Sequence, residues 1–217
     1  MVSLFALLLL TTVSAQDPKP CYSPPLMSGG MTVMADNGKM MSTGTISFDN
    51  FGQRVRATNY GISANGSVAI DLLMLFKEKV YYEIDWTKVT CKKKRLNADF
   101  IPMHVPADAK LMGQVVMGSS SSWGMGVLIN NWVGTLPQNG YYNAVFTEVG
   151  CIPMTYMGYG PSGFNFISTF NWVLGTTDPM SFIPPFICAR SALDQSEEPA
   201  NFFTALSSLA KMTETEE

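Results

Sequence analysis

Apolar and polar residues alternate with a period of two along much of the chain. In residues 80–87 the apolar positions are Val80, Tyr82, Ile84 and Trp86, and the positions between them are mostly polar. This alternation predicts a β-strand with one buried face, because successive side chains of a strand point to opposite sides. Residues 43–49 have the same pattern, with Ile46 and Phe48 on the apolar side.

One run is apolar on both sides. Residues 68–76 place Leu72 and Met74 on one face, and Leu73 and Leu75 on the other. A strand of this kind is typical of the centre of a sheet, where both faces are covered.

Residues that tolerate tight turns separate these runs. Asn139-Gly140 lies between residues 125–133 and 141–149, which predicts a hairpin. Further strands are expected at residues 31–35, 53–59, 111–117, 152–157 and 164–174. About ten strands with short connections indicate a mostly β fold, either one twisted antiparallel sheet folded over or two stacked sheets.

The chain divides into three expected parts. Residues 1–15 predict a signal peptide, because residues 4–10 are apolar and the small side chains of Val13 and Ala15 suit cleavage. Residues 16–192 form one β domain, and residues 193–217 form a tail. The tail is either a short helix capped by Asn201 or a mobile segment. No later stretch is long and apolar enough to predict a membrane span.

Because the chain is expected to be secreted, its cysteines and its glycosylation sequon predict specific modifications. The four cysteines Cys21, Cys91, Cys151 and Cys188 are widely spaced, which predicts two disulfides with three possible connectivities rather than a zinc site. Asn65-Gly66-Ser67 predicts glycosylation at Asn65.

The charge pattern argues against nucleic acid as a partner. The chain has 14 Lys and Arg against 17 Asp and Glu, for a net charge of −3. A mildly acidic protein has no broad attraction for nucleic acid. The one basic run, residues 92–95, is interpreted as a solvated turn.

The residues needed for catalysis are scarce. The single histidine, His104, lies between two prolines and makes a poor candidate for a general base. The serines of residues 119–122 lack the spacing of a nucleophile elbow. The sequence therefore predicts a protein that is not an enzyme.

The abundant methionine and aromatic side chains leave two interpretations open. The chain has 15 Met, 13 Phe, 8 Tyr and 4 Trp. Such residues can line a cavity for apolar ligands or fill a core, and composition alone favours the core.

Several segments occur in an order that resembles the ependymin-related family over nearly all of the mature chain. They are Cys21-Tyr22-Ser23-Pro24-Pro25-Leu26, Phe48-Asp49 followed by Gln53-Arg54-Val55-Arg56, Tyr82-Glu83-Ile84-Asp85, Val149-Gly150-Cys151-Ile152-Pro153, and the stretch from Asp178 to Cys188. The resemblance implies a lipoprotein-carrier-like (LolA-like) fold with few short helices, in which two stacked antiparallel sheets surround a hydrophobic pocket. It implies the pairs Cys21–Cys151 and Cys91–Cys188.

The resemblance also implies a function. It points to a secreted or lysosomal glycoprotein, often a homodimer, that binds a fatty acid or another lipid and is associated with calcium. The pocket candidates on the strands are Ile46, Phe48, Val55, Leu72, Met74, Tyr82, Ile84 and Trp86. The alternative is a structural or cell-adhesion protein of the extracellular matrix that carries no ligand.

Overall fold

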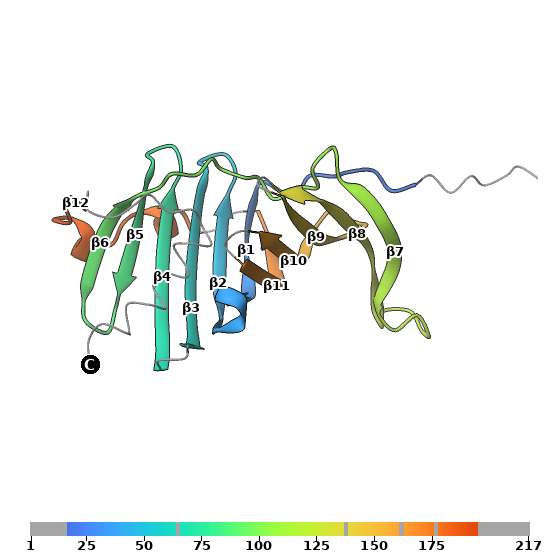
Figure 1. The fold of residues 1–217 in the computed structure, drawn as a ribbon, viewed down its shortest axis with the longest axis horizontal. Helices are drawn as coiled ribbons and strands as arrows, with labels where there is room; N and C mark the ends of the chain where they lie inside the picture. Colours follow the sequence, from blue (N-terminus) through green and yellow to red (C-terminus); the bar gives the residue numbers. More distant parts are fainter. Residues whose placement is uncertain (1–16, 64–65, 137–138, 161–162, 176–177, 195–217) are drawn as a thin grey trace, which may run out of the picture.

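The computed structural model describes residues 17–63, 66–136, 139–160, 163–175 and 178–194, and it consists mainly of β-strands (Figure 1). The first six strands are β1 (Leu26–Ala35), β2 (Met40–Asp49), β3 (Arg54–Ser63), β4 (Gly66–Leu75), β5 (Val80–Asp85) and β6 (Thr90–Arg95). The others are β7 (Lys110–Gly118), β8 (Gly126–Leu136), β9 (Gly140–Thr147), β10 (Pro153–Gly160), β11 (Gly163–Leu174) and β12 (Leu193–Asp194). Three short 3-10 helices are η1 (Asp36–Gly38), η2 (Pro179–Phe182) and η3 (Phe186–Cys188).

The strands form one continuous open sheet in the order β12-β6-β5-β4-β3-β2-β1-β11-β10-β9-β8-β7. The mostly β class is confirmed, but the sheet is single where the resemblance implies two stacked sheets. The junction is the antiparallel pairing of β1 with β11, which runs from Met27 opposite Leu174 to Met34 opposite Phe166. Periodicity predicts strands, and it cannot say which strands distant in the chain become neighbours.

Two glycines of β1 allow this strand to lie close to the aromatic side chains of β11 at the junction. A Cβ atom on Gly30 would lie 2.1 Å from the ring of Phe170, and one on Gly29 would lie 2.9 Å from the ring of Trp172. Both rings belong to β11, so the bare backbone of β1 leaves the space that they occupy.

The register defines two faces of the sheet. Val33 is opposite Ile167, and Ile167 is opposite Tyr156, so these side chains share one side, which we call the inner face. The inner face carries two buried clusters, one around Leu72 on β1–β5 and one around Trp132 on β8 and β9. A third cluster around Leu73 lies on the opposite side, the outer face.

Each face is covered by a connecting segment. Residues 96–105, which we call the strap, cross the inner face between β6 and β7; Leu96 and Phe100 pack on the first cluster and Val105 joins the second. On the outer face, η2 and η3 place Phe182 and Cys188 over Leu73, Tyr82 and Ile84. The disulfide Cys91–Cys188 ties this second cover to β6.

The basic run of residues 92–95 is not a turn but most of strand β6, so its interpretation as a solvated turn is wrong. Lys94 faces inward and forms an ion pair with Glu83 on β5, with 3.0 Å between Nζ and Oε2, and both side chains are 3% exposed. Charge alone suggested solvent exposure, whereas the carboxylate of Glu83 allows Lys94 to be buried.

Several expectations fall on parts of the chain that the structure does not describe. Residues 1–15, Asn65 and residues 195–217, which include the expected cap Asn201, lie outside the described residues. The first two residues of the expected tail form β12, which pairs in parallel with β6. No helix in the described part of the chain has the length and apolar character needed to cross a membrane.

Candidate functional site

Five of the eight pocket candidates lie together on the inner face. Ile46, Phe48, Val55, Leu72 and Met74 belong to one buried cluster on β2, β3 and β4. The register brings Phe48 opposite Val55 and Val55 opposite Met74, so the three form a row across the sheet. This group is the part of the predicted pocket that the structure brings together.

The other three candidates lie on the outer face. Tyr82 and Ile84 pack against Phe182 and Cys188, beneath the second cover. Trp86 is partly exposed, and its Nε1 donates a hydrogen bond to Asp71 Oδ2 at 2.6 Å. Alternation indicates which residues of β5 share a face, but not that the intervening residues, including Tyr81, point inward.

Sequence reasoning missed a set of inward methionines. Met27, Met31 and Met40 are at most 1% exposed and belong to the same cluster as Leu72. For Met27 and Met31 the signal was alternation in β1, where these residues and Val33 are separated by even numbers of residues. Together with Met74, these thioethers give the inner face an unbranched lining that can adapt to shape.

The strap closes this lining mainly through aromatic contacts. The ring of Phe100 stacks on Phe48, with 5.4 Å between centroids, and meets Phe76 edge-on at 5.2 Å. The backbone hydrogen bonds of the strap lie toward its ends: Leu96 N donates to Lys79 O, and Val105 N donates to Cys21 O. Its middle part is therefore held by side-chain contacts, namely the packing of Phe100 and an exposed ion pair between Lys79 Nζ and Asp99 Oδ1 at 3.4 Å.

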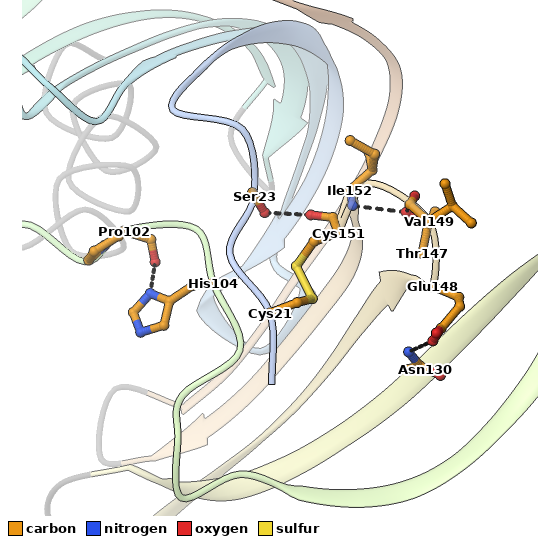
Figure 2. Close-up of a disulfide and its surroundings, with 10 residues drawn as sticks. All are labelled: Cys21, Ser23, Pro102, His104, Asn130, Thr147, Glu148, Val149, Cys151 and Ile152. Carbon is orange, nitrogen blue, oxygen red and sulfur yellow. Dashed lines mark hydrogen bonds between the residues drawn. A yellow bond between two sulfur atoms is a disulfide. The ribbon is translucent and has the colours of Figure 1, made fainter. Parts of the chain in front are cut away.

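The far end of the strap is anchored through the first disulfide (Figure 2). Cys21 is bonded to Cys151, with 5.9 Å between the Cα atoms, and Ser23 Oγ donates to Cys151 O at 2.6 Å. Ser23 N also donates to Met103 O. The pairs Cys21–Cys151 and Cys91–Cys188 are those that the resemblance implies.

Besides the Lys94–Glu83 ion pair, two places on the inner face carry buried polar atoms that lack a hydrogen-bond partner among the described residues. Asn59 is fully buried; its Nδ2 donates to Ser42 Oγ at 3.1 Å, and its Oδ1 has no hydrogen-bond partner in the part of the chain that the structure describes. Beneath the strap end, the buried Nε1 of Trp132 and hydroxyl of Tyr142 likewise have no hydrogen-bond partner among the described residues. Buried polar groups without partners are costly, so each of these atoms could bind the polar part of a ligand.

The second of these places also holds two phenols. Tyr142 and Tyr156 stack with 6.1 Å between ring centroids. Burial, and secondarily the charge of Asp108, raises the pKa of Tyr142 above its ordinary value, and burial raises that of Tyr156. Both phenols therefore stay protonated at neutral pH.

A shallow cavity of about 170 Å³ lies on the outer face, lined by Thr58, Trp86 and neighbouring residues. Asp71 is among the lining residues and pairs with Arg56, whose Nε donates to Asp71 Oδ1 at 2.9 Å. The hydrogen bond that Arg56 donates to Asp71 raises the pKa of Arg56. Arg56 also donates to Ser181 O, so this ion pair holds the second cover in place.

The single histidine packs against neighbouring residues of the strap and of the N-terminal segment. His104 Nδ1 lies 2.9 Å from Pro102 O, and its ring stacks on Tyr22 with 5.1 Å between centroids. Within the described part of the chain, no three His, Cys, Asp or Glu side chains gather closely enough to hold a metal ion.

Comparisons with known proteins give consistent matches. A family model described as Ependymin matches residues 64–188. Ependymin-2 of Carassius auratus is 31% identical over 200 residues, covering 92% of this chain and 93% of the relative. Ependymin of Notemigonus crysoleucas is 30% identical over 200 residues with the same coverage.

One solved structure supports the fold. An uncharacterized conserved protein from Thermus thermophilus aligns with a TM-score of 0.50 and 8% sequence identity. The alignment covers 82% of this chain and 91% of that protein. At this identity the similarity concerns the fold alone.

Proposed function

Because this chain belongs to the ependymin family, we propose that it is a secreted, non-enzymatic protein that binds a hydrophobic ligand, a fatty acid or another lipid, on the inner face of its sheet. The observation that carries this proposal is the methionine-lined cluster around Leu72, which lies beneath a strap whose middle is held by side-chain contacts.

The chemistry of the lining suits an acyl chain. Met27, Met31, Met40 and Met74 are unbranched and flexible, so they can fill the space without a ligand and move aside for one. Transfer of apolar ligand surface into this site is favourable by about 25 cal/mol per Å². The unpartnered Oδ1 of Asn59 can accept a hydrogen bond from a hydroxyl or amide group of the ligand.

Binding requires the strap to move, because the inward side chains are buried. Withdrawal of Phe100 from Phe48 and Phe76 would uncover the centre of the cluster. The disulfide-linked end at Cys21 would act as the fixed point.

Leu72 and Leu73 provide a matched pair for the test. They are adjacent on β4, both are 0% exposed, and they face the inner and outer clusters respectively. Replacement of either by Ala creates a cavity and costs about 2–5 kcal/mol of stability. Only Leu72→Ala removes ligand contacts, so it should weaken uptake of a fluorescent fatty acid about tenfold, while Leu73→Ala changes it little. Equal effects of the two substitutions on uptake would contradict the inner-face site.

The second candidate function is a structural or adhesive protein, and the exposed part of the outer face favours it. Met41 lies opposite Ile62 and Met34, and Met34 is opposite Phe166, so an apolar row crosses four strands. Its neighbours on that face include Tyr141 and Tyr159, whose rings stack with 6.4 Å between centroids.

We assign this apolar row to the interface of a homodimer. None of the strand positions in it is charged, so a second copy would meet no like-charge repulsion, and Met and Tyr are enriched in interfaces. Ile62→Asp should convert a dimer to a monomer in sedimentation velocity, with Phe51→Asp, at another exposed apolar position, as control. A dimer unaffected by Ile62→Asp would exclude this interface, whereas ligand uptake by the monomer would favour the carrier over the structural function.

The remaining assignments concern processing and calcium. Secretion accords with the two disulfides, which are typical of oxidising compartments, and with the signal peptide and the Asn65 glycan expected from the sequence. The described residues contain no cluster of metal ligands, and the proposed ligand site includes no calcium.

A further inference from the structure

The hairpin formed by β7 and β8 extends beyond the rest of the sheet (Figure 1). β9 pairs with β8 only as far as Ile129, whose partner is Thr147, and Glu148 N then donates to Leu128 O. From there, β7 and β8 continue as a two-stranded ribbon to the turn of residues 119–125. We call this part, from Val116 through Leu128, the tip.

Apolar side chains are exposed on every side of the tip. Val116 and Leu128 are opposite each other on the inner face, and both are 40% exposed. Met117 and Val127 form the corresponding pair on the outer face and are also exposed. At the turn, Trp123 is fully exposed.

The tip also lacks charge. No Asp, Glu, Lys, Arg or His occurs in residues 111–147. A carboxylate, that of Glu148, accepts hydrogen bonds from Gln114 and Asn130 at the base of the tip. Figure 2 shows the bond between Glu148 and Asn130.

The exposure of apolar side chains on all sides of the tip and its lack of charge together indicate what the tip contacts. A protein partner would cover one face of the ribbon and leave the other in water, whereas an apolar medium surrounds both faces and the turn. We propose that the tip inserts into the surface of a zwitterionic lipid bilayer, with Trp123 at the level of the lipid headgroups or below. Trp is enriched at this level in membrane proteins because its ring is amphipathic.

The backbone of the tip is suited to this environment. Ser119 N donates to Met125 O at 2.9 Å, Met125 N donates to Ser122 O, and Ser121 N donates to Ser119 Oγ. Together with the pairing of β7 and β8, these bonds lower the cost of removing the turn from water. Among the described strands none pairs with the outward edge of β7, so only shallow insertion is favourable.

The dimensions agree with shallow insertion. Two or three residues of each strand lie beyond the end of β9, which at about 3.3 Å per residue corresponds to roughly 7–10 Å. Amphipathic helices that lie at a membrane surface bury their apolar face to a comparable depth of about 5–10 Å. Glu148 at the base would then stay in water and disfavour anionic lipid.

The test is flotation of the mature full-length protein with phosphatidylcholine vesicles. The wild type should float, equally well at low and high salt and no better when phosphatidylserine is added. Trp123→Ser combined with Met125→Ser should lower the bound fraction by at least about tenfold, because two exposed apolar side chains are lost. Phe51→Ser, at an exposed apolar position on another turn, should bind like the wild type.

A second measurement locates the inserted residue. Brominated phosphatidylcholine should quench the tryptophan fluorescence of the wild type, and Trp123→Phe should float but lose this quenching. Failure of the wild type to float, binding that requires phosphatidylserine, or an equal loss in Phe51→Ser would overturn the proposal. A change of oligomeric state in the tip variant without a change in flotation would also overturn it. A wild type that takes up fatty acid but does not float would reject the membrane contact and leave the inner-face site intact.

Discussion

Lys94 and Glu83 form an ion pair between neighbouring strands on the inner face, with 3.0 Å between Nζ and Oε2 and 3% of each side chain exposed. Removal of one partner leaves a charge buried, which costs about 3–5 kcal/mol. Lys94→Met should therefore lower the free energy of unfolding in urea by an amount of this order.

The double variant Lys94→Met with Glu83→Leu is the control. It removes both charges and keeps apolar volume, so it should recover most of the stability lost in Lys94→Met. A double variant as unstable as the single one would show that the pair is not the reason for the loss.

The disulfide Cys91–Cys188 closes a long loop and holds η3 against the outer cluster. For a loop of about 100 residues, loss of the cross-link is expected to cost about 4–5 kcal/mol through the entropy of the unfolded chain. Replacement of both cysteines by Ser should lower the unfolding midpoint and increase the binding of an apolar dye, since Tyr82 and Ile84 lose their cover. An unchanged midpoint would contradict this role.

Asp49 gives the stability a defined pH dependence. Burial tends to raise its pKa, but hydrogen bonds from Gly52 N and Arg54 outweigh burial, and the pKa of Asp49 lies below its ordinary value. A carboxylate with a lowered folded-state pKa contributes stability above its unfolded-state pKa of about 3.9, and this contribution is lost as the pH falls through the folded-state pKa.

The free energy of unfolding should therefore decrease as the pH is lowered below about 4. Asp49→Asn should be less stable at neutral pH and should depend less on pH in this range. The measurement is urea unfolding at several pH values. A variant with the full acid dependence of the wild type would assign that dependence to other groups.

Two glycines lie in different surroundings: the backbones of β2 and β3 approach closely at Gly44, whereas the space beside Gly113 is open. A Cβ atom on Gly44 would lie 2.0 Å from Thr58 O, whereas one on Gly113 would meet nothing within 4 Å. Gly44→Ala should destabilise by at least about 2 kcal/mol, because β2 and β3 must separate. Gly113→Ala should be neutral within about 0.5 kcal/mol in thermal unfolding. Equal effects would contradict the close approach of β2 to β3.

The sequence predicted the strands better than their arrangement. Alternation located ten of the strands, and the doubly apolar run of residues 68–76 is a central strand with Leu72 and Leu73 buried on opposite faces. It did not predict β6, because Lys92, Lys93 and Lys94 resemble a solvated segment until Glu83 is placed beside Lys94. The junction of β1 with β11 depends on residues more than 100 positions apart, which local patterns do not encode.

The candidate site was predicted in part for the same reason. Ile46, Phe48, Val55, Leu72 and Met74 share a face, as the pattern within each strand indicated. Tyr82 and Ile84 were grouped with them because a strand's alternation does not say which of its two faces is inner. The strap was not recognised, since Phe100 and Met103 have no periodic neighbours and gain their role only from packing.

The central claim is that the inner face accommodates a lipid. Native mass spectrometry of the protein isolated from its own source, before and after extraction with organic solvent, tests it most directly. The account predicts a bound species of acyl-chain mass that the solvent removes and that added fatty acid restores. Protein that carries no such species and takes up no fatty acid after extraction would contradict it.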